Sequence, residues 1–117
     1  VNERYLAAFD ARPQRAETLV ELARVERLRG RHARAYLYAS QAWRTPHPQG
    51  DILFVDASAY TWRAADELSI AAYWTGRFEE SLQLNTKLMA LATTPEEQRP
   101  RIQANLDFAL QKLAATP

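Results

Sequence analysis

The segment DELSIAAYWTGRFEES, residues 66–81, contains the pattern that decides the fold of this 117-residue chain. It predicts the end of one helix, a turn at Gly76, and the start of a second helix that packs back on the first. Gly76 can adopt the positive φ that a helix exit often requires. Small residues at Ser69, Ala72 and Ser81 allow two helical backbones to approach closely. We therefore expect a helical hairpin, an architecture that by itself names no reaction.

A second turn with the same spacing is centred on Gly30. A leucine lies eight residues before each glycine, and a small residue lies seven residues before it. Another small residue lies five residues after each glycine. These matching pairs are Leu22 and Leu68, Ala23 and Ser69, and Ala35 and Ser81. The chain thus contains two similar predicted hairpins.

Apolar residues at helical spacing predict about six helices, and glycine and proline mark their ends. The expected segments are a first helix within residues 1–13, a hairpin over 16–45, an inserted loop over 46–57, a second hairpin over 58–92 and a capping helix over 99–114. In the capping helix, the predicted buried stripe is Ile102, Leu106, Ala109, Leu110 and Leu113. The short apolar run 52–55 has no strand partner elsewhere in the sequence, so we assign it to the loop.

Two helix starts have recognisable capping signals. Asp56 or Ser58 is a plausible N-cap for the helix that leads to Gly76. Thr94 and Glu97 have capping-box spacing around Pro95. Because Pro100 lacks a backbone donor, we expect a short turn there before the last helix begins.

Length and composition narrow the possible classes of protein. The chain fits one domain, and it has no apolar run of the roughly 20 residues that a membrane span requires. It contains no cysteine, which excludes disulfides, thiolate zinc sites and cysteine nucleophiles. These features fit a cytoplasmic setting. Because the chain begins with Val1, we expect it to be a segment of a longer polypeptide.

Charge is unevenly distributed along the chain. Residues 1–50 hold nine Arg against five Asp plus Glu, a balance of +4, and residues 51–117 hold six Lys plus Arg against nine Asp plus Glu, a balance of −3. Five arginines lie between Arg24 and Arg34, which offers a site for nucleic acid or another polyanion. No aromatic residues interleave with them as base-stacking platforms, so we favour a solvated helix end.

The paired turns resemble the tetratricopeptide repeat, a helix–turn–helix unit of about 34 residues. In that frame the first full repeat begins near Ala16 and the second near Trp62, and residues 1–13 correspond to the second helix of an earlier repeat. The two glycines are 46 residues apart, and the excess over one repeat falls in the inserted loop. The resemblance implies a stack of antiparallel helical hairpins with a concave surface lined by the first helix of each pair.

A narrower resemblance rests on longer segments. YLAAF with RP (5–9 and 12–13), DILFV (51–55), YTWR (60–63) and AYWTGRFEES (72–81) look like the repeat-containing segment found beside glycosyltransferase domains in some bacterial proteins. The resemblance covers nearly the whole chain. It implies a helical accessory domain, with nucleotide-sugar and metal chemistry carried by a separate α/β domain whose motifs are absent here.

No catalytic constellation is evident in the sequence. His47 with Asp51 or Asp56 does not provide three metal ligands at regular spacing. Asp66 and Glu67 are adjacent on a helix, so their side chains diverge by about 100° rather than converge. We therefore expect a segment that is not an enzyme and that holds no metal or cofactor.

The repeat frame instead places a candidate binding groove on the first helix of each hairpin. Its predicted residues are Glu17, Val20, Arg24, Arg27, Arg63, Asp66, Ile70, Tyr73 and Trp74. Arginine can bind a carboxylate through paired hydrogen bonds, and aromatic faces offer rigid apolar surface. The competing interpretation is an internal Arg24–Asp66 ion pair with Tyr73 and Trp74 in the core. For Trp74 the sequence leaves core and groove open.

These observations predict a protein-interaction or scaffolding module. Its expected partner is a polypeptide segment or a neighbouring glycosyltransferase domain. One alternative is direct binding of an acceptor sugar by Trp74, Tyr73 and Asp66. The other is binding of nucleic acid or another polyanion by the arginines between Arg24 and Arg34.

Overall fold

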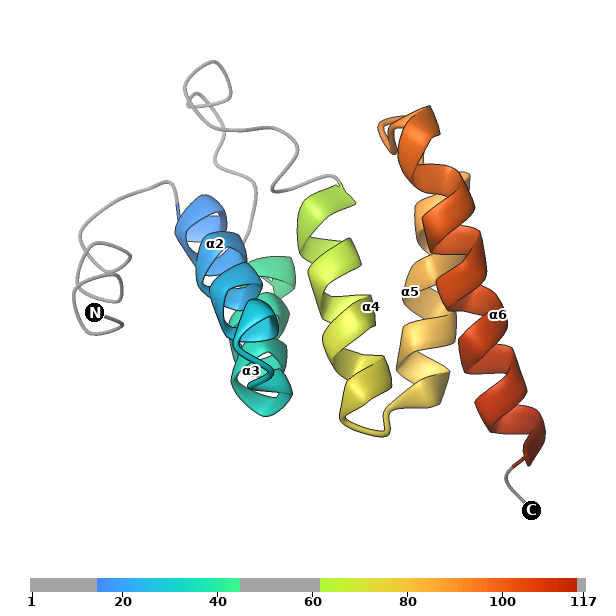
Figure 1. Cartoon of the computed structure of the whole chain (residues 1–117). Helices are drawn as coiled ribbons and strands as arrows, with labels where there is room; N and C mark the ends of the chain where they lie inside the picture. The colour runs from blue at the N-terminus through green and yellow to red at the C-terminus, as the bar shows by residue number, and fades with distance from the viewer. Residues whose placement is uncertain (1–14, 45–61, 116–117) are drawn as a thin grey trace.

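The structure is a computed structural model that describes residues 15–44 and 62–115. These residues form an all-α arrangement of sequentially packed helices (Figure 1). The elements are α2 (Arg15–Leu28), α3 (His32–Arg44), α4 (Ala64–Trp74), α5 (Phe78–Ala90), the short 3₁₀ helix η2 (Glu96–Gln98) and α6 (Arg99–Ala115). The expected helix within 1–13, the loop over 46–57 and the N-cap candidates Asp56 and Ser58 lie outside the described residues.

Each helix packs against the next one along the chain. In addition, α2 contacts α4, and α4 contacts α6. In Figure 1, α2, α4 and α6 run in the same direction, whereas α3 and α5 run the opposite way. The predicted hairpins α2–α3 and α4–α5 are therefore present, and α6 packs on the second of them. None of the helices in the described part of the chain combines the length and apolar character needed to cross a bilayer.

The two glycine turns have the same hydrogen bonds. Gly30 and Gly76 have φ of 74° and 83°, as the sequence predicts. After each helix, the glycine N–H donates to the carbonyl three residues earlier, and the next N–H donates to the carbonyl five residues earlier. The second of these bonds is Arg31 to Glu26 at 2.8 Å in one turn and Arg77 to Ala72 at 2.7 Å in the other. This is the Schellman arrangement, which satisfies the last carbonyls of a helix.

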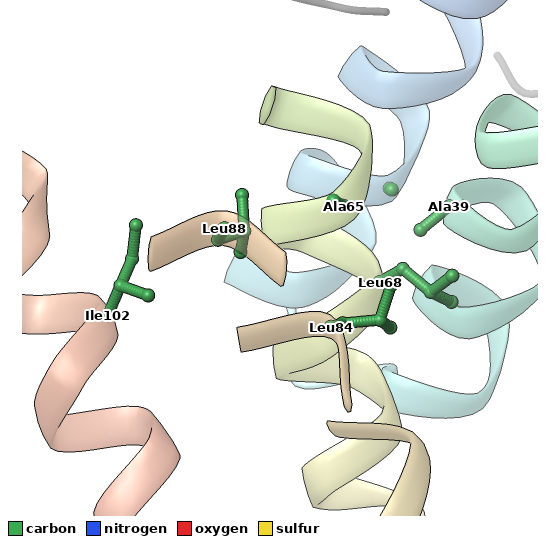
Figure 2. Close-up of a cluster of buried hydrophobic side chains, with 7 residues drawn as sticks. Ala39, Ala65, Leu68, Leu84, Leu88 and Ile102 are labelled. Atoms are coloured by element: carbon green, nitrogen blue, oxygen red, sulfur yellow. The ribbon is translucent and has the colours of Figure 1, made fainter. Parts of the chain in front are cut away.

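The main core cluster joins all five α-helices of the described residues (Figure 2). It contains Ala23 of α2, Ala39 of α3, Ala65 and Leu68 of α4, Leu84 and Leu88 of α5, and Ile102 of α6. Ile102 and Leu88 are completely buried, so α6 is held to the hairpin by tightly packed apolar side chains. A second cluster of Leu19, Val20, Leu22, Ala42 and Ala64 connects α2, α3 and α4.

Small residues bring α4 and α5 close together, as predicted. Ser69, Ala72 and Ser81 are at most 1% exposed. The Ser81 hydroxyl donates to the Ser69 carbonyl at 2.9 Å, and the Ser69 hydroxyl donates to the Asp66 carbonyl at 2.8 Å. The buried hydroxyls are thus satisfied across a seam that larger side chains would hold apart.

The junction between α5 and α6 differs from the predicted capping box. Thr94 is buried, and its hydroxyl donates to the Leu88 carbonyl at 2.7 Å rather than capping the following helix. The guanidinium of Arg99 donates to the carbonyls of Met89, Leu91 and Thr94. Both side chains therefore satisfy groups at the end of α5. The short turn before the last helix is present as η2, and α6 begins at Arg99.

Leu28 and Leu110 are well exposed, and Leu110 belongs to the stripe predicted to be buried. Leu28, at the end of α2, is 65% exposed, and Leu110 of α6 is 45% exposed. Ile102 and Ala109 are the buried residues of α6. Helical periodicity locates an apolar face without setting how much of that face a neighbouring helix covers.

Candidate functional site

The face formed by α2, α4 and α6 contains two adjoining hollows. Ile70 of α4 and Asn105 of α6 line both of them. We call the two hollows together the groove. One end is rich in arginine and carboxylate side chains, and the other is rich in aromatic side chains.

The charged hollow has a volume of about 390 Å³. Its lining comes from three helices and the two residues before α4: Arg24 and Arg27 of α2; Trp62, Arg63, Asp66, Glu67 and Ile70; and Gln98, Arg101 and Asn105 near the start of α6. Four arginines and two carboxylates therefore surround this space.

Two bidentate ion pairs connect the walls of the charged hollow. Arg27 donates to the two carboxylate oxygens of Glu67 at 2.8 and 3.1 Å, which joins α2 to α4. Arg101 donates to the two oxygens of Asp66 at 3.1 and 2.8 Å, which joins α6 to α4. Asp66 and Glu67 thus point to opposite neighbours, as adjacent helical residues should. The hydrogen bond with Glu67 is the main cause of the raised pKa of Arg27.

The predicted Arg24–Asp66 pair does not form. Arg24 instead donates to Glu21 on its own helix, from Nε at 3.0 Å and from Nη2. Arg63 also approaches Glu21, at 3.8 Å. The hydrogen bond from Arg24 is the largest cause of the lowered pKa of Glu21; burial opposes it, and the charges of Arg24 and Arg63 support it.

The aromatic hollow is smaller, with a volume of about 120 Å³. It is lined by Ser69, Ile70, Tyr73 and Trp74 of α4, Ser81 of α5, and Asn105 and Phe108 of α6. Trp74 is 62% exposed and Phe108 is 50% exposed, which is unusual for side chains of this size. Trp74 is therefore a groove residue and not a core residue.

The Trp74 ring is held by two aromatic neighbours. It stacks on His32 with ring centroids 5.3 Å apart and an interplanar angle of 19°. Tyr73 meets it edge-on at 5.4 Å, and Tyr73 in turn packs edge-on against Phe78. These contacts fix the orientation of one wall of the aromatic hollow.

The structure brings seven of the predicted groove residues together. Arg24, Arg27, Arg63 and Asp66 line the charged hollow, Tyr73 and Trp74 the aromatic hollow, and Ile70 both. Val20 does not belong to the groove, because it is 1% exposed and packs in the core with Leu19 and Ala64. Glu17 is partly buried on α2 and is not among the residues that line either hollow.

Other groove residues were not predicted from the sequence. They are Trp62, Glu67 and Ser69, then Ser81 of α5, and Gln98, Arg101, Asn105 and Phe108 from η2 and α6. The sequence predicts the last helix as a cap and assigns none of its residues to the groove. Extending the repeat frame to α6 would have assigned its polar side to the groove, since α6 follows α5 as α4 follows α3.

The arginine cluster does not form a single patch. Arg24 and Arg27 line the charged hollow, whereas Arg29 and Arg31 approach the buried carboxylate of Glu26 at 3.8 and 3.6 Å. Arg34 lies on α3, exposed to solvent. These arginines therefore have different surroundings, and only Arg24 and Arg27 line the charged hollow.

Among the described residues, no three His, Cys, Asp or Glu side chains gather in a geometry that could hold a metal ion. The candidate ligands His47, Asp51 and Asp56 fall in the part of the chain that is not described. The Asp66 and Glu67 carboxylates each accept paired bonds from arginine, which makes both of them structural anions of the groove wall.

The fold and the groove define this protein as an all-α domain whose alternate helices share a hollowed face. Comparisons with protein families, with curated proteins and with solved structures find no match for this chain.

Proposed function

We propose that this domain is a protein-interaction module built as a tetratricopeptide-like stack, and that it binds a polypeptide segment along the groove of α2, α4 and α6. As the sequence resemblance implies, it would serve as an accessory to a glycosyltransferase domain of the same polypeptide and would carry no catalytic site of its own.

The repeat architecture is supported by the two glycine turns. Gly30 and Gly76 have similar positive φ values and the same pattern of hydrogen bonds. The side chains around them also match, with Ala23 and Ser69 completely buried before the turns and Ala35 and Ser81 buried after them. Such agreement in sequence and in geometry is expected of two copies of one structural unit.

The groove is the single observation that carries the binding function. Its two hollows adjoin along α4, and most of their lining comes from α2, α4 and α6. Exposed aromatic and arginine side chains are the residue types enriched at protein interfaces. A surface made of two adjoining hollows suits an extended polypeptide better than a small metabolite, which would need a closed pocket.

Selection from a displayed library of random 12-residue peptides would test this function. We expect wild-type protein to enrich specific peptides and Asn105→Trp, which places a large ring between the two hollows, to lose them. Thr86→Trp is the matched control, because Thr86 is exposed on α5 and lines neither hollow. Failure to enrich any peptide, or equal enrichment by wild type and Asn105→Trp, would reject the proposal.

Acceptor-sugar binding is the second candidate, and the exposure of Trp74 favours it because sugars stack on aromatic faces. Two observations reduce its support. His32 already covers one face of the Trp74 ring, and both oxygens of Asp66 accept bonds from Arg101. Calorimetric titration with oligosaccharides and nucleotide sugars would decide: saturable binding that Trp74→Ala abolishes in a folded protein would establish this candidate.

A further inference from the structure

We infer that the occupant of the groove is an extended acidic peptide that carries one large apolar or aromatic anchor residue and a carboxylate about three residues from it. This inference rests on the proposed peptide-binding function and specifies the chemistry of the partner. It follows from the separate characters of the two hollows and from the distance between them.

The aromatic hollow fits the anchor. Its volume of about 120 Å³ is of the order of an apolar cavity that accommodates a benzene ring. Tyr73, Trp74 and Phe108 surround it, and the last two expose large apolar areas. Covering these rings with an apolar side chain would remove their exposed surface from water, which is the main driving force of association.

The charged hollow selects an anion. The oxygens of Asp66 and Glu67 already accept hydrogen bonds from Arg101 and Arg27. A cationic side chain would therefore compete with arginines that are in place. Four arginines line the hollow, and the carboxylates that line or pair with them are three, Asp66, Glu67 and Glu21, so positive charge is in excess. Charge complementarity thus favours an occupant with a carboxylate.

Two guanidinium groups on α2, those of Arg24 and Arg27, have N–H donors available for a ligand. Arg24 and Arg27 each use Nε and Nη2 in their bonds to Glu21 and Glu67. Within the described residues, Nη1 of neither arginine has an acceptor, although a guanidinium carries five N–H donors. The two side chains are three residues apart on one helix face, so a single carboxylate can reach both.

Helix geometry sets the spacing between the anchor and the carboxylate. Glu67, which binds Arg27, and Trp74 are seven residues apart on α4, a rise of about 10 Å. An extended peptide advances about 3.3 Å per residue. The carboxylate therefore lies about three residues from the anchor along the bound segment.

The test compares the residue preferences of the peptides that each variant selects from the same random library. Wild type should enrich an aromatic or large aliphatic residue with Asp or Glu two to four positions away. Peptides selected by Arg24→Ala should lose the preference for an acidic residue and keep the preference for an apolar anchor. Peptides selected by Phe108→Ala should lose the preference for the apolar anchor and keep the preference for an acidic residue. For the best wild-type peptide, replacing its acid by the amide should weaken binding about tenfold to wild type and less than twofold to Arg24→Ala.

Arg34→Ala and Leu37→Ala are the matched controls, since both residues are exposed on α3 and line neither hollow. They should select the same peptides as wild type. If peptides are enriched but are basic, or carry no acid near the anchor, or keep their acidic preference with Arg24→Ala, this inference is wrong while the proposed function stands. If no peptide is enriched, both are wrong.

Discussion

Trp74 is a large side chain that lines the groove and lies outside the buried core. It is 62% exposed, and its contacts are the rings of His32 and Tyr73. Leu68, one and a half turns earlier on α4, is 2% exposed and lies in the main core cluster. The same helix therefore supplies the core with one face and the groove with another.

We predict that Trp74→Ala lowers the free energy of unfolding by about 1 kcal/mol or less, since it removes mainly surface contacts. Leu68→Ala should lower it by about 2–5 kcal/mol, because it leaves a cavity in the core. Urea denaturation followed by circular dichroism measures both. Equal losses of stability for the two variants would show that Trp74 is a core residue.

The Arg27–Glu67 pair gives a second prediction. Glu67 has a side chain only 11% exposed, so Arg27→Ala would leave a carboxylate with little access to water. We expect a loss of about 1–3 kcal/mol in the free energy of unfolding. The double variant Arg27→Leu with Glu67→Leu should lie within about 1 kcal/mol of wild type, because neither charge is then left alone.

Chemical denaturation of the three proteins in parallel provides the measurement. If the double variant were less stable than Arg27→Ala, the bidentate pair itself would be a net source of stability. The expectation that the Arg27–Glu67 pair contributes little to the free energy of unfolding would then be wrong.

The lowered pKa of Glu21 leads to a prediction that the stability of the fold depends on pH. Its pKa in the folded protein is lowered, chiefly by the hydrogen bond from Arg24. A lowered pKa means that the folded state favours the carboxylate, so ionised Glu21 stabilises the folded protein. This stabilisation is complete above the ordinary pKa of 4.5 and is lost as the pH falls through the pKa of the folded state. The difference in stability between wild type and Glu21→Gln should therefore shrink below about pH 4.5. A difference that stays constant from pH 6 to pH 3 would contradict the assignment.

At the scale of the elements, the turns are the features that the sequence predicts best. A glycine just after an apolar helix commonly ends that helix with a positive φ. Both Gly30 and Gly76 adopt this conformation. Thr94 shows the opposite case. Its spacing to Glu97 suits a capping box, but the nearby end of α5 offers the Leu88 carbonyl, which its hydroxyl binds instead. Local spacing cannot reveal an acceptor from a neighbouring element.

The turns give a prediction with a clear physical cause. A Cβ added at Gly30 or Gly76 would meet nothing within 4 Å, so only the backbone conformation opposes a substitution. Gly76→Ala and Gly30→Ala should each reduce the free energy of unfolding by about 1 kcal/mol. Asparagine tolerates positive φ better than alanine, so Gly76→Asn should cost less. Thermal melts compare them, and an unchanged melting temperature for both alanine variants would contradict the role given to the glycines.

At the scale of the whole molecule, the order and direction of the described helices follow from the sequence pattern, but the groove follows only in part. Residues on α2 and α4 could be assigned from the repeat frame. Val20 was misassigned because that frame gives a position on a helix without showing how deeply a neighbour covers it. The repeat frame can be extended to α6, but which of its residues line the hollows, here Arg101, Asn105 and Phe108, depends on how α6 packs against α4, and spacing within one helix does not encode that packing.

Peptide binding along α2, α4 and α6 is tested most directly by a chemical-shift map. Isotope-labelled protein would be titrated with the tightest peptide from the library selection. We predict shifts at the Trp74 indole N–H and at the amides of Arg24, Ile70, Asn105 and Phe108, with little change at Leu37, Gln83 and Thr86 on α3 and α5. Shifts concentrated on α3 and α5, or no shifts with any selected peptide, would contradict the account.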